Sequence, residues 1–254
     1  MLFLTDERFL EHVAGKKHPE SPARLEAVWK GLDNLFLGDD LVRIEPRIAT
    51  ETELLRCHPI EHIKALEALD ANGGGRMDPD TRISKGSWDA ARLAAGSGLA
   101  AVEALIQTQA ETAVCAIRPP GHHATSNRSM GVCLINNIAI TAASLIAKGE
   151  KVAVIDIDAH HGNGTQEIFY SDPRGLMISI HQWPLYPGTG SEEEIGELEG
   201  KGFTVNVPLP PGATGSTYRS ALDKIVVPLV EDFQADWILA VSYTHLTLPT
   251  ILLV

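Results

Sequence analysis

The sequence predicts an α/β fold whose mainly parallel sheet is covered by helices. Short apolar runs alternate with helical patterns along most of the 254 residues, which is typical of parallel strands joined by crossover helices. Several of these runs end directly in polar, reactive residues, as happens where ligands gather beyond the carboxyl ends of strands. The composition, 44% hydrophobic and 21% charged, fits one large globular domain of this class.

Helices are predicted where caps and apolar spacing coincide. Ser21 precedes a proline and an amphipathic pattern, so a helix begins there. Ser87 caps an alanine-rich helix that extends to residue 107, and further helices lie near 135–147 and 216–232. Strands are predicted for the apolar runs at residues 113–117, 152–157, 176–180, 203–207 and 237–241.

The net charge of −12 argues against a nucleic-acid-binding protein, because no basic stripe is present to neutralise phosphates. No apolar stretch approaches the ~20 residues of a membrane-spanning helix, and the acidic N-terminus is unlike a secretory signal. Cys57, Cys115 and Cys133 lack metal or redox spacing and are expected to be reduced. We therefore expect a cytoplasmic protein.

Asp156, Asp158 and His160 end the run at 152–157 and lie two residues apart. On a strand, side chains with this spacing share a face, so two carboxylates and an imidazole would converge. Burying unpaired carboxylates is costly, whereas a divalent cation such as Zn²⁺ would compensate both charges. The alternative is an aspartate-rich loop that points into solvent.

Two other strand ends carry polar residues. The run at 113–117 leads through Pro119 and Pro120 to His122 and His123, and paired imidazoles suit proton transfer near neutral pH. The run at 176–180 leads into a loop rich in aromatic residues, glycine and proline, which is either the wall of a pocket or an ordinary structured loop.

His58 and His62 lie four residues apart, a spacing that two metal ligands on one helix can have. Pro59 argues against such a pair, because a helix would start at that proline and leave His58 outside it.

Five motifs occur in one order and together resemble the zinc-dependent histone deacetylase family, most closely its class II and bacterial acetoin-utilisation-type members. The resemblance covers residues 1–241. The motifs are HisProGluSerProAlaArgLeu at 18–25, ArgProProGlyHisHis at 118–123, GlyValCysLeuIleAsnAsn at 131–137, AspIleAspAlaHisHisGlyAsnGlyThr at 156–165 and TyrProGlyThrGly at 186–190.

The resemblance implies a three-layer arginase/deacetylase-like fold and hydrolysis of an acetylated amine, either acetyl-lysine of a peptide or protein or an acetylpolyamine. It implies that Asp158 and His160 ligate one Zn²⁺. It also implies that a structural monovalent cation such as K⁺ is held by Asp156, Asp158, His160 and Ser179.

By the same resemblance, His122 pairs with Asp156, while His123 contacts Asn163 and acts as the proton-transferring base and acid. The substrate-binding residues that it implies are the Gly131 carbonyl, Tyr186 in the acyl-lysine tunnel, and Asp78 or Asp80 on the rim. Val132 stands where many family members place a tunnel-wall aromatic residue, which leaves substrate preference open.

The sequence departs from the family after the run at 237–241. The third zinc ligand of the family is an aspartate in a GlyPheAspAlaHis-like turn, and here no acidic residue follows Asp236. The glycine-rich segment with the oxyanion-stabilising tyrosine is also missing. We expect a catalytic domain over residues 1–241, incomplete at its end, and a non-native or frameshifted tail over 242–254. The alternatives are a true short variant, or His245 as a replacement ligand.

Three functional hypotheses follow. The leading one is a truncated copy of a zinc-dependent deacetylase. A ureohydrolase would need a carboxylate at Gly162 for its second metal ion, which argues against that class. A non-catalytic module that binds acyl-lysine or polyamines is consistent with the missing ligand. The sequence does not indicate an oligomeric state.

Overall fold

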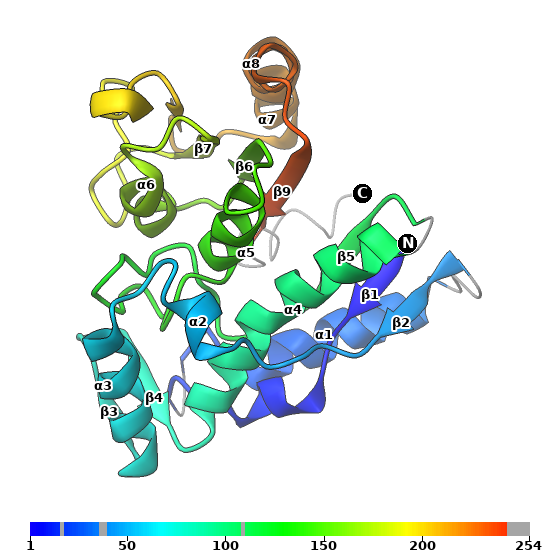
Figure 1. Cartoon of the computed structure of the whole chain (residues 1–254), viewed down its shortest axis with the longest axis vertical. Coiled ribbons are helices and arrows are strands. Elements are labelled where there is room, and N and C mark those ends of the chain that lie inside the picture. Colours follow the sequence, from blue (N-terminus) through cyan, green and yellow to red (C-terminus); the bar gives the residue numbers. More distant parts are fainter. Residues whose placement is uncertain (16–17, 36–39, 108–109, 243–254) are drawn as a thin grey trace. The chain divides into compact units, whose positions relative to one another are not determined.

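The computed structural model describes residues 1–15, 18–35, 40–107 and 110–242. The chain forms two compact units, Met1–Thr141 and the chain from Ala142 onward, and parallel sheets with helices build both (Figure 1). The predicted α/β class is therefore confirmed. The predicted tail and His245 lie outside the described residues, apart from Ser242.

The first unit contains a parallel three-stranded sheet in the order β2 (Val42–Ile44), β1 (Leu2–Leu4), β5 (Ala113–Cys115). Leu2 and Leu4 of β1 pack against Ala100 and Ala101 of α4 (Ser87–Gln107), because small alanines allow the helix to approach the sheet. The remaining elements are η1 (Glu7–Glu11), α1 (Pro22–Asp33), α2 (Glu51–Leu54), α3 (Ile60–Ala71) and the hairpin of β3 (Gly74–Arg76) and β4 (Arg82–Ser84).

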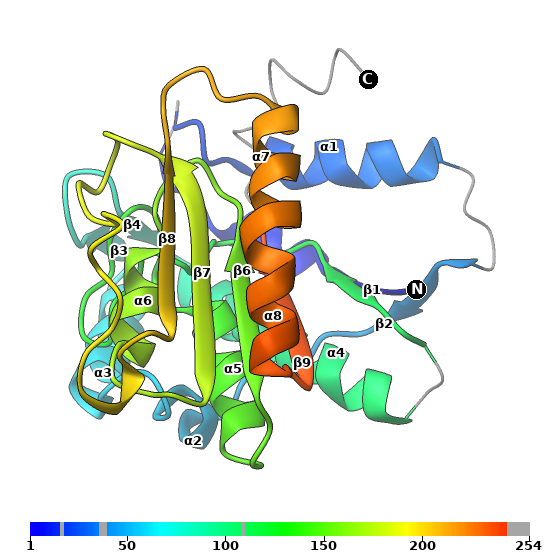
Figure 2. The ribbon, with the colours of Figure 1, turned by 90° about the horizontal axis from the view of Figure 1, so that it is seen from above.

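The second unit contains a parallel four-stranded sheet, visible in Figure 2. Its strand order is β8 (Thr204–Leu209), β7 (Gly175–Gln182), β6 (Val152–Asp156), β9 (Trp237–Val241). Asp156, the last residue of β6, is in register with Ser179 of β7 on one side and with Val241 of β9 on the other. Three strands thus converge on the first acidic residue of the predicted site.

Helices cover both faces of this sheet. On one face, Leu176, Ile178 and Ile180 of β7 pack against α7 (Gly215–Ala221) and α8 (Val227–Phe233). On the other face, Gly175 lies against side chains of α5 (Asn137–Ile146) and α6 (Asn163–Phe169), where an added Cβ would be in ordinary van der Waals contact with Ile146 and Phe169. Because β7 is buried along seven of its eight residues, its sequence is a continuous apolar run.

The predicted helices and strands are found, with three differences. Ser87 is the first residue of α4 and not its cap, since its hydroxyl accepts the N–H of Ser84 and Gly86 accepts the first helical N–H. The helix predicted near 216–232 contains a π-helical turn at Leu222–Val226, just before Pro228, which has no N–H to donate. The third difference is that the short strands β1 and β2 were not predicted, because their sequences show no clear alternation of apolar and polar residues. None of the described helices is long and apolar enough to cross a membrane.

Candidate active site

Two consecutive carboxylates shape the turn that follows β6. Asp156 Oδ1 accepts the N–H of Asp158 at 3.0 Å, and Asp158 Oδ1 accepts the N–H of His160 at 2.8 Å. Aspartate favours this kind of turn, in which the side chain binds the backbone two residues on. Both carboxylates are buried, with exposed fractions of 3% and 0%. The alternative of an aspartate-rich loop that points into solvent is therefore wrong.

The turn brings Asp158 and His160 together as a possible metal-binding pair. Nδ1 of His160 lies 3.1 Å from Oδ1 of Asp158. Two ligand atoms on a tetrahedral zinc ion lie roughly 3.4 Å apart, given Zn–O and Zn–N bonds of about 2.1 Å. The donor types and their separation fit zinc, and only modest movement would be needed to admit it.

The described residues do not complete this site. A catalytic zinc ion takes three protein ligands, yet no group of three histidine, cysteine or acidic residues that could hold a metal occurs among them. The register of β9 places Val241 beside Asp156. A third ligand from this neighbouring strand end would come from the chain beyond Ser242, outside the described residues, where the sequence contains no carboxylate.

Tyr186 lies next to His160 of this pair. Its ring meets the ring of His160 edge to face, with centroids 6.0 Å apart, and 44% of the tyrosine is exposed. An aromatic side chain placed between a ligand and solvent suits the wall of an entrance to the site. Its predicted place near the pair is consistent with this geometry, and its role in a tunnel stays a prediction.

A partly buried hydrogen-bond network fixes the loop that carries Tyr186. Glu194 Oε1 accepts the N–H groups of Gly190 and Ser191 at 2.8 and 3.0 Å, and its Oε2 accepts from Gln166 Nε2 at 2.6 Å. Burial alone would raise the pKa of Glu194, but the hydrogen bonds from Ser191, Gln166 and Gly190 lower it. The charged carboxylate is thus the form that holds the loop.

Two histidine rings enclose Gly190 of the same loop. A Cβ at this position would lie 2.6 Å from both His161 Cγ and His181 Nε2, and its φ is +95°. Only glycine fits both the space and the backbone conformation. His161 also binds Thr189 at 2.9 Å and Gln166 at 3.0 Å. The sequence reasoning did not detect this network, whose members come from separate motifs.

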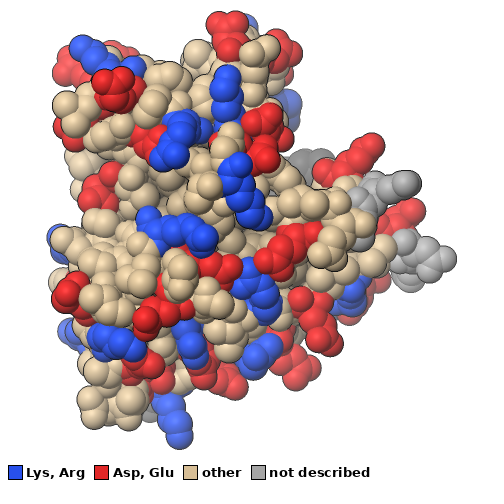
Figure 3. All heavy atoms as spheres, viewed as in Figure 1, with Lys and Arg blue, Asp and Glu red and all other residues tan. Residues whose placement is uncertain are grey.

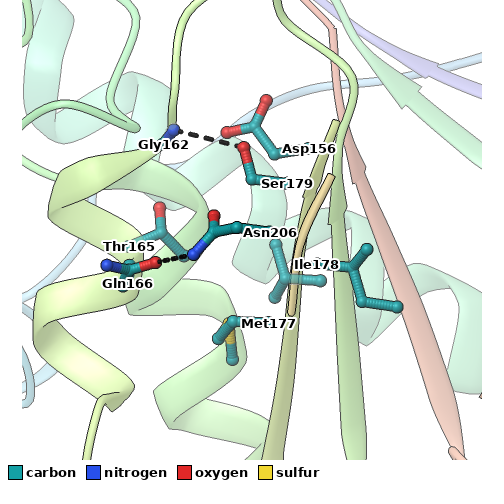
Figure 4. A pocket seen from close by; sticks show the side chains of 9 residues that line it. Asp156, Gly162, Thr165, Gln166, Met177, Ile178, Ser179 and Asn206 are labelled. Atoms are coloured by element: carbon teal, nitrogen blue, oxygen red, sulfur yellow. Dashed lines mark hydrogen bonds between the residues drawn. The ribbon is translucent and has the colours of Figure 1, made fainter. Parts of the chain in front are cut away.

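Asp156 and Ser179 line a small cavity of about 10 Å³ beneath the turn, shown in Figure 4. That volume is about enough for one water-sized particle. Ser179 Oγ binds His181 Nδ1 at 3.0 Å, and Asn206 enters from β8 and donates to Gln166 Oε1 at 2.8 Å. The structure therefore brings Asp156 and Ser179 together, while the monovalent cation assigned to them stays a prediction.

In the first unit, His122 and His123 stack with ring centroids 4.0 Å apart and are each only 4% exposed. The segment before them begins at Arg118, whose guanidinium is buried with the carboxylate of Glu20 and also donates to the carbonyls of Phe9 and His12 at 2.7 and 3.0 Å. A buried bidentate pair fixes position as well as charge. The segment that leads to the histidine pair is therefore held in place at Arg118.

Two further buried histidines hold the chain that follows this pair. His58 Nδ1 binds the carbonyl of Ser126 at 2.9 Å and its Nε2 accepts the N–H of Asn136, while His62 Nε2 binds the carbonyl of Leu134. Burial lowers the pKa of His58 to about 4. These rings are neutral backbone partners, so their spacing of four has a structural cause.

The rim residues predicted to bind substrate have different surroundings. Asp78 Oδ1 accepts the N–H groups of Asp80 and Thr81 and so closes its own loop. The side chain of Asp80 is 68% exposed and its Oδ1 lies 2.9 Å from His18 Nε2. Of the two carboxylates, Asp80 is the more accessible to a ligand.

The histone deacetylase domain, as a sequence family, matches residues 18–242. The chain belongs to the histone deacetylase family. It is 43% identical over 235 residues to a "Probable deacetylase" of Archaeoglobus fulgidus, covering 91% of this chain and 65% of the relative. It is 39% identical over 232 residues to a "Histone deacetylase-like amidohydrolase" of Pseudomonas aeruginosa, covering 90% and 61%. The chain thus spans less than two thirds of the length of these two relatives.

The fold comparison agrees. The crystal structure of the HDA15 HD domain matches with a TM-score of 0.90 and 35% identity, over 95% of this chain and 70% of that one. The three-layer arginase/deacetylase-like fold expected for a histone deacetylase family member is confirmed. The pairings of His122 with Asp156 and of His123 with Asn163 join residues of different units, and they stay predictions.

The sequence reasoning missed one phenol near the two aspartates. Tyr218 of α7 has a raised pKa, first because it is partly buried and then because the carboxylates of Asp158 and Asp156 are near. On the face shown in Figure 3, the described lysines and arginines lie scattered among acidic side chains instead of forming a basic stripe.

Proposed function

We propose that this chain is the scaffold of a zinc-dependent deacetylase that hydrolyses an acetylated amine, either acetyl-lysine or an acetylpolyamine, and releases acetate. The observation that carries the proposal is the 3.1 Å approach of Asp158 Oδ1 and His160 Nδ1 at the end of β6, in a chain of the histone deacetylase family. Both donors are of the kind that zinc binds.

Asp158 and His160 would hold the zinc ion, which when bound polarises a carbonyl and acidifies water. The stacked pair of His122 and His123 would move the protons, because imidazole titrates near neutral pH. Asp156 would orient His122, and Asn163 would contact His123. Gly131, Tyr186 and Asp80 would then bind the substrate, and Asp156 with Ser179 would hold a structural monovalent cation.

Asp158 and His160 are the two candidate zinc ligands among the described residues. Loss of a partner outside the ligand shell typically weakens metal binding 10–100-fold, roughly, and loss of a ligand itself should weaken it more. Asp158 and His160 alone should therefore hold zinc far more weakly than a site with three protein ligands.

Acetate release from acetyl-lysine peptides and acetylpolyamines tests the proposal. The chain is compared, with and without Zn²⁺, with a chimera in which the residues after Val241 are replaced by the strand end and following segment of a longer family member that carries the GlyPheAspAlaHis turn. We expect zinc-dependent release by the chimera, at least ~100-fold faster than by the chain. No release by the fully zinc-loaded chimera from any acylated amine would contradict the proposal.

A second candidate is an acyl-amine-binding module without turnover. It is favoured by the absence of a third ligand among the described residues. Calorimetry with acetylated and unacetylated forms of one peptide separates the two candidates, since the module requires acetyl-dependent binding with no acetate formed. The three cysteines, which all lie among the described residues, are not joined in disulfides, and this supports a reducing, cytoplasmic location as part of the proposal.

A further inference from the structure

The turn at Met130–Cys133 is strained at one residue. Met130 and Cys133 exchange two backbone hydrogen bonds of 3.1 and 3.0 Å, and the two residues between them both have positive φ, +55° at Gly131 and +61° at Val132. Turns of this kind place glycine, asparagine or aspartate at such positions. A β-branched valine there is a genuine outlier, which persists only if its surroundings enforce it.

One hydrogen bond stabilises the strained conformation of Val132. The N–H of Val132 donates to Oγ1 of Thr81 at 3.1 Å, and Thr81 is completely buried. Thr81 is itself fixed, because its N–H donates to Asp78 Oδ1 and its carbonyl accepts the N–H of Met77 at 2.9 Å. The acceptor for the strained residue thus belongs to a closed, rigid loop.

The turn packs directly against His123 of the histidine pair. A Cβ on Gly131 would lie 2.4 Å from Cδ2 of His123 and 3.0 Å from its Cβ, so the backbone of the turn is packed against the imidazole ring. The ring of His123 also lies against the ring of His122, with centroids 4.0 Å apart and planes inclined by 39°. Any shift of the turn therefore changes the space in which His123 sits.

We propose that Thr81 is a positioning residue, whose hydroxyl oxygen holds Val132 in its strained conformation and thereby fixes the turn against the ring of His123. The consequence for proton transfer rests on the proposed function, whereas the support of the turn by Thr81 does not. The alternative is that Thr81 only fills space in the core.

Three variants separate these two roles. Thr81→Val keeps the size but removes the acceptor, and Thr81→Ser keeps the hydroxyl. Ile83→Val perturbs only the packing of the one buried side chain of the neighbouring strand β4. The readouts are the hydrogen-exchange rate of the Val132 amide and the imidazole NMR signals of His123. Neither readout requires zinc or turnover, so the test is independent of the proposed deacetylase activity.

We expect Thr81→Val to speed exchange at Val132 by about fivefold to tenfold, the effect of one lost hydrogen bond, and to shift the signals of His123. Thr81→Ser and Ile83→Val should leave both near the wild-type values. If Thr81→Val lowers the melting temperature but leaves the Val132 exchange and the His123 signals unchanged, Thr81 is only a packing residue and the proposal is wrong.

A second background tests the strain itself. Val132→Gly removes the penalty for positive φ, since glycine adopts this conformation readily. We therefore expect Thr81→Val to shift the His123 signals less in the Val132→Gly protein than in the wild type. An equal shift in both backgrounds would show that Thr81 does not act through the strained valine.

Discussion

Arg118 and Glu20 form a buried bidentate ion pair, with Nε and Nη2 of the arginine 2.5 and 2.6 Å from Oε1 and Oε2 of the glutamate. The two side chains are 4% and 2% exposed. The pair joins the N-terminal segment to the chain that leads into the histidine pair, across 98 residues of sequence. Removing one partner leaves the other charge buried without compensation.

Glu20→Gln should therefore lower the free energy of unfolding by about 3–5 kcal/mol, as measured by urea denaturation. The control is Glu67→Gln, which breaks the exposed pair with Lys64 and should have little effect on the free energy of unfolding, because water screens exposed ion pairs. Equal effects of the two substitutions would mean that the buried pair does not anchor the segment.

Stability should fall on mild acidification because of buried histidines. Burial is the main cause that lowers the pKa of His12 to about 4, opposed by Glu20 and reinforced by Arg118, and burial likewise lowers the pKa of His58 to about 4. The unfolded chain, with an ordinary pKa of 6.5, binds more protons between these values. The stabilisation is thus complete above pH 6.5 and lost as the pH falls toward 4, by about 2 kcal/mol per histidine between pH 7 and pH 5.

Urea denaturation at pH 7 and pH 5 measures this loss. His12→Gln and His58→Gln remove one titrating group each, so each variant should lose about 2 kcal/mol less than the wild type over this interval. Both are expected to be less stable than the wild type at pH 7, because His12 binds Ser87 and His58 binds Ser126. A pH dependence identical to that of the wild type in both variants would refute the assignment.

Glu194 should control the order of the loop that carries Tyr186. Glu194→Gln removes the negative charge. It also replaces one of the two carboxylate oxygens, which accept hydrogen bonds from Gln166 and Gly190, by an NH2 group that cannot accept them. Exchange at the amides of Gly190 and Ser191 should accelerate by about tenfold, measured by hydrogen exchange with mass spectrometry. Glu192→Gln, an exposed neighbour on the same loop, is the matched control and should change nothing.

Local patterns were sufficient to predict the parallel sheet and the burial that the apolar run at 152–157 indicated. The reason given for the convergence of the polar residues was wrong, because β6 ends at Asp156 and a turn, not strand spacing, brings Asp158 and His160 together. The role of the two aspartates within the turn could not be predicted from the sequence, because aspartate serves both as a metal ligand and as an acceptor for backbone N–H groups. Only the structure shows that both side chains also shape the turn.

The supporting contacts could not be predicted, because their partners lie far apart in the sequence. Thr81 meets Val132 across 51 residues and His58 meets Asn136 across 78. Neither partner stands out by composition or period. Val132 itself gave no signal, since nothing in a sequence marks a valine at positive φ.

The central claim, that Asp158 and His160 are two zinc ligands, is tested most directly by anomalous diffraction at the zinc edge from crystals grown with one equivalent of Zn²⁺. We predict one anomalous peak at roughly 2.0–2.2 Å from a carboxylate oxygen of Asp158 and from Nδ1 of His160, and its loss in Asp158→Asn. A fully zinc-loaded chain whose peak lies elsewhere, with none at this pair, would contradict the account.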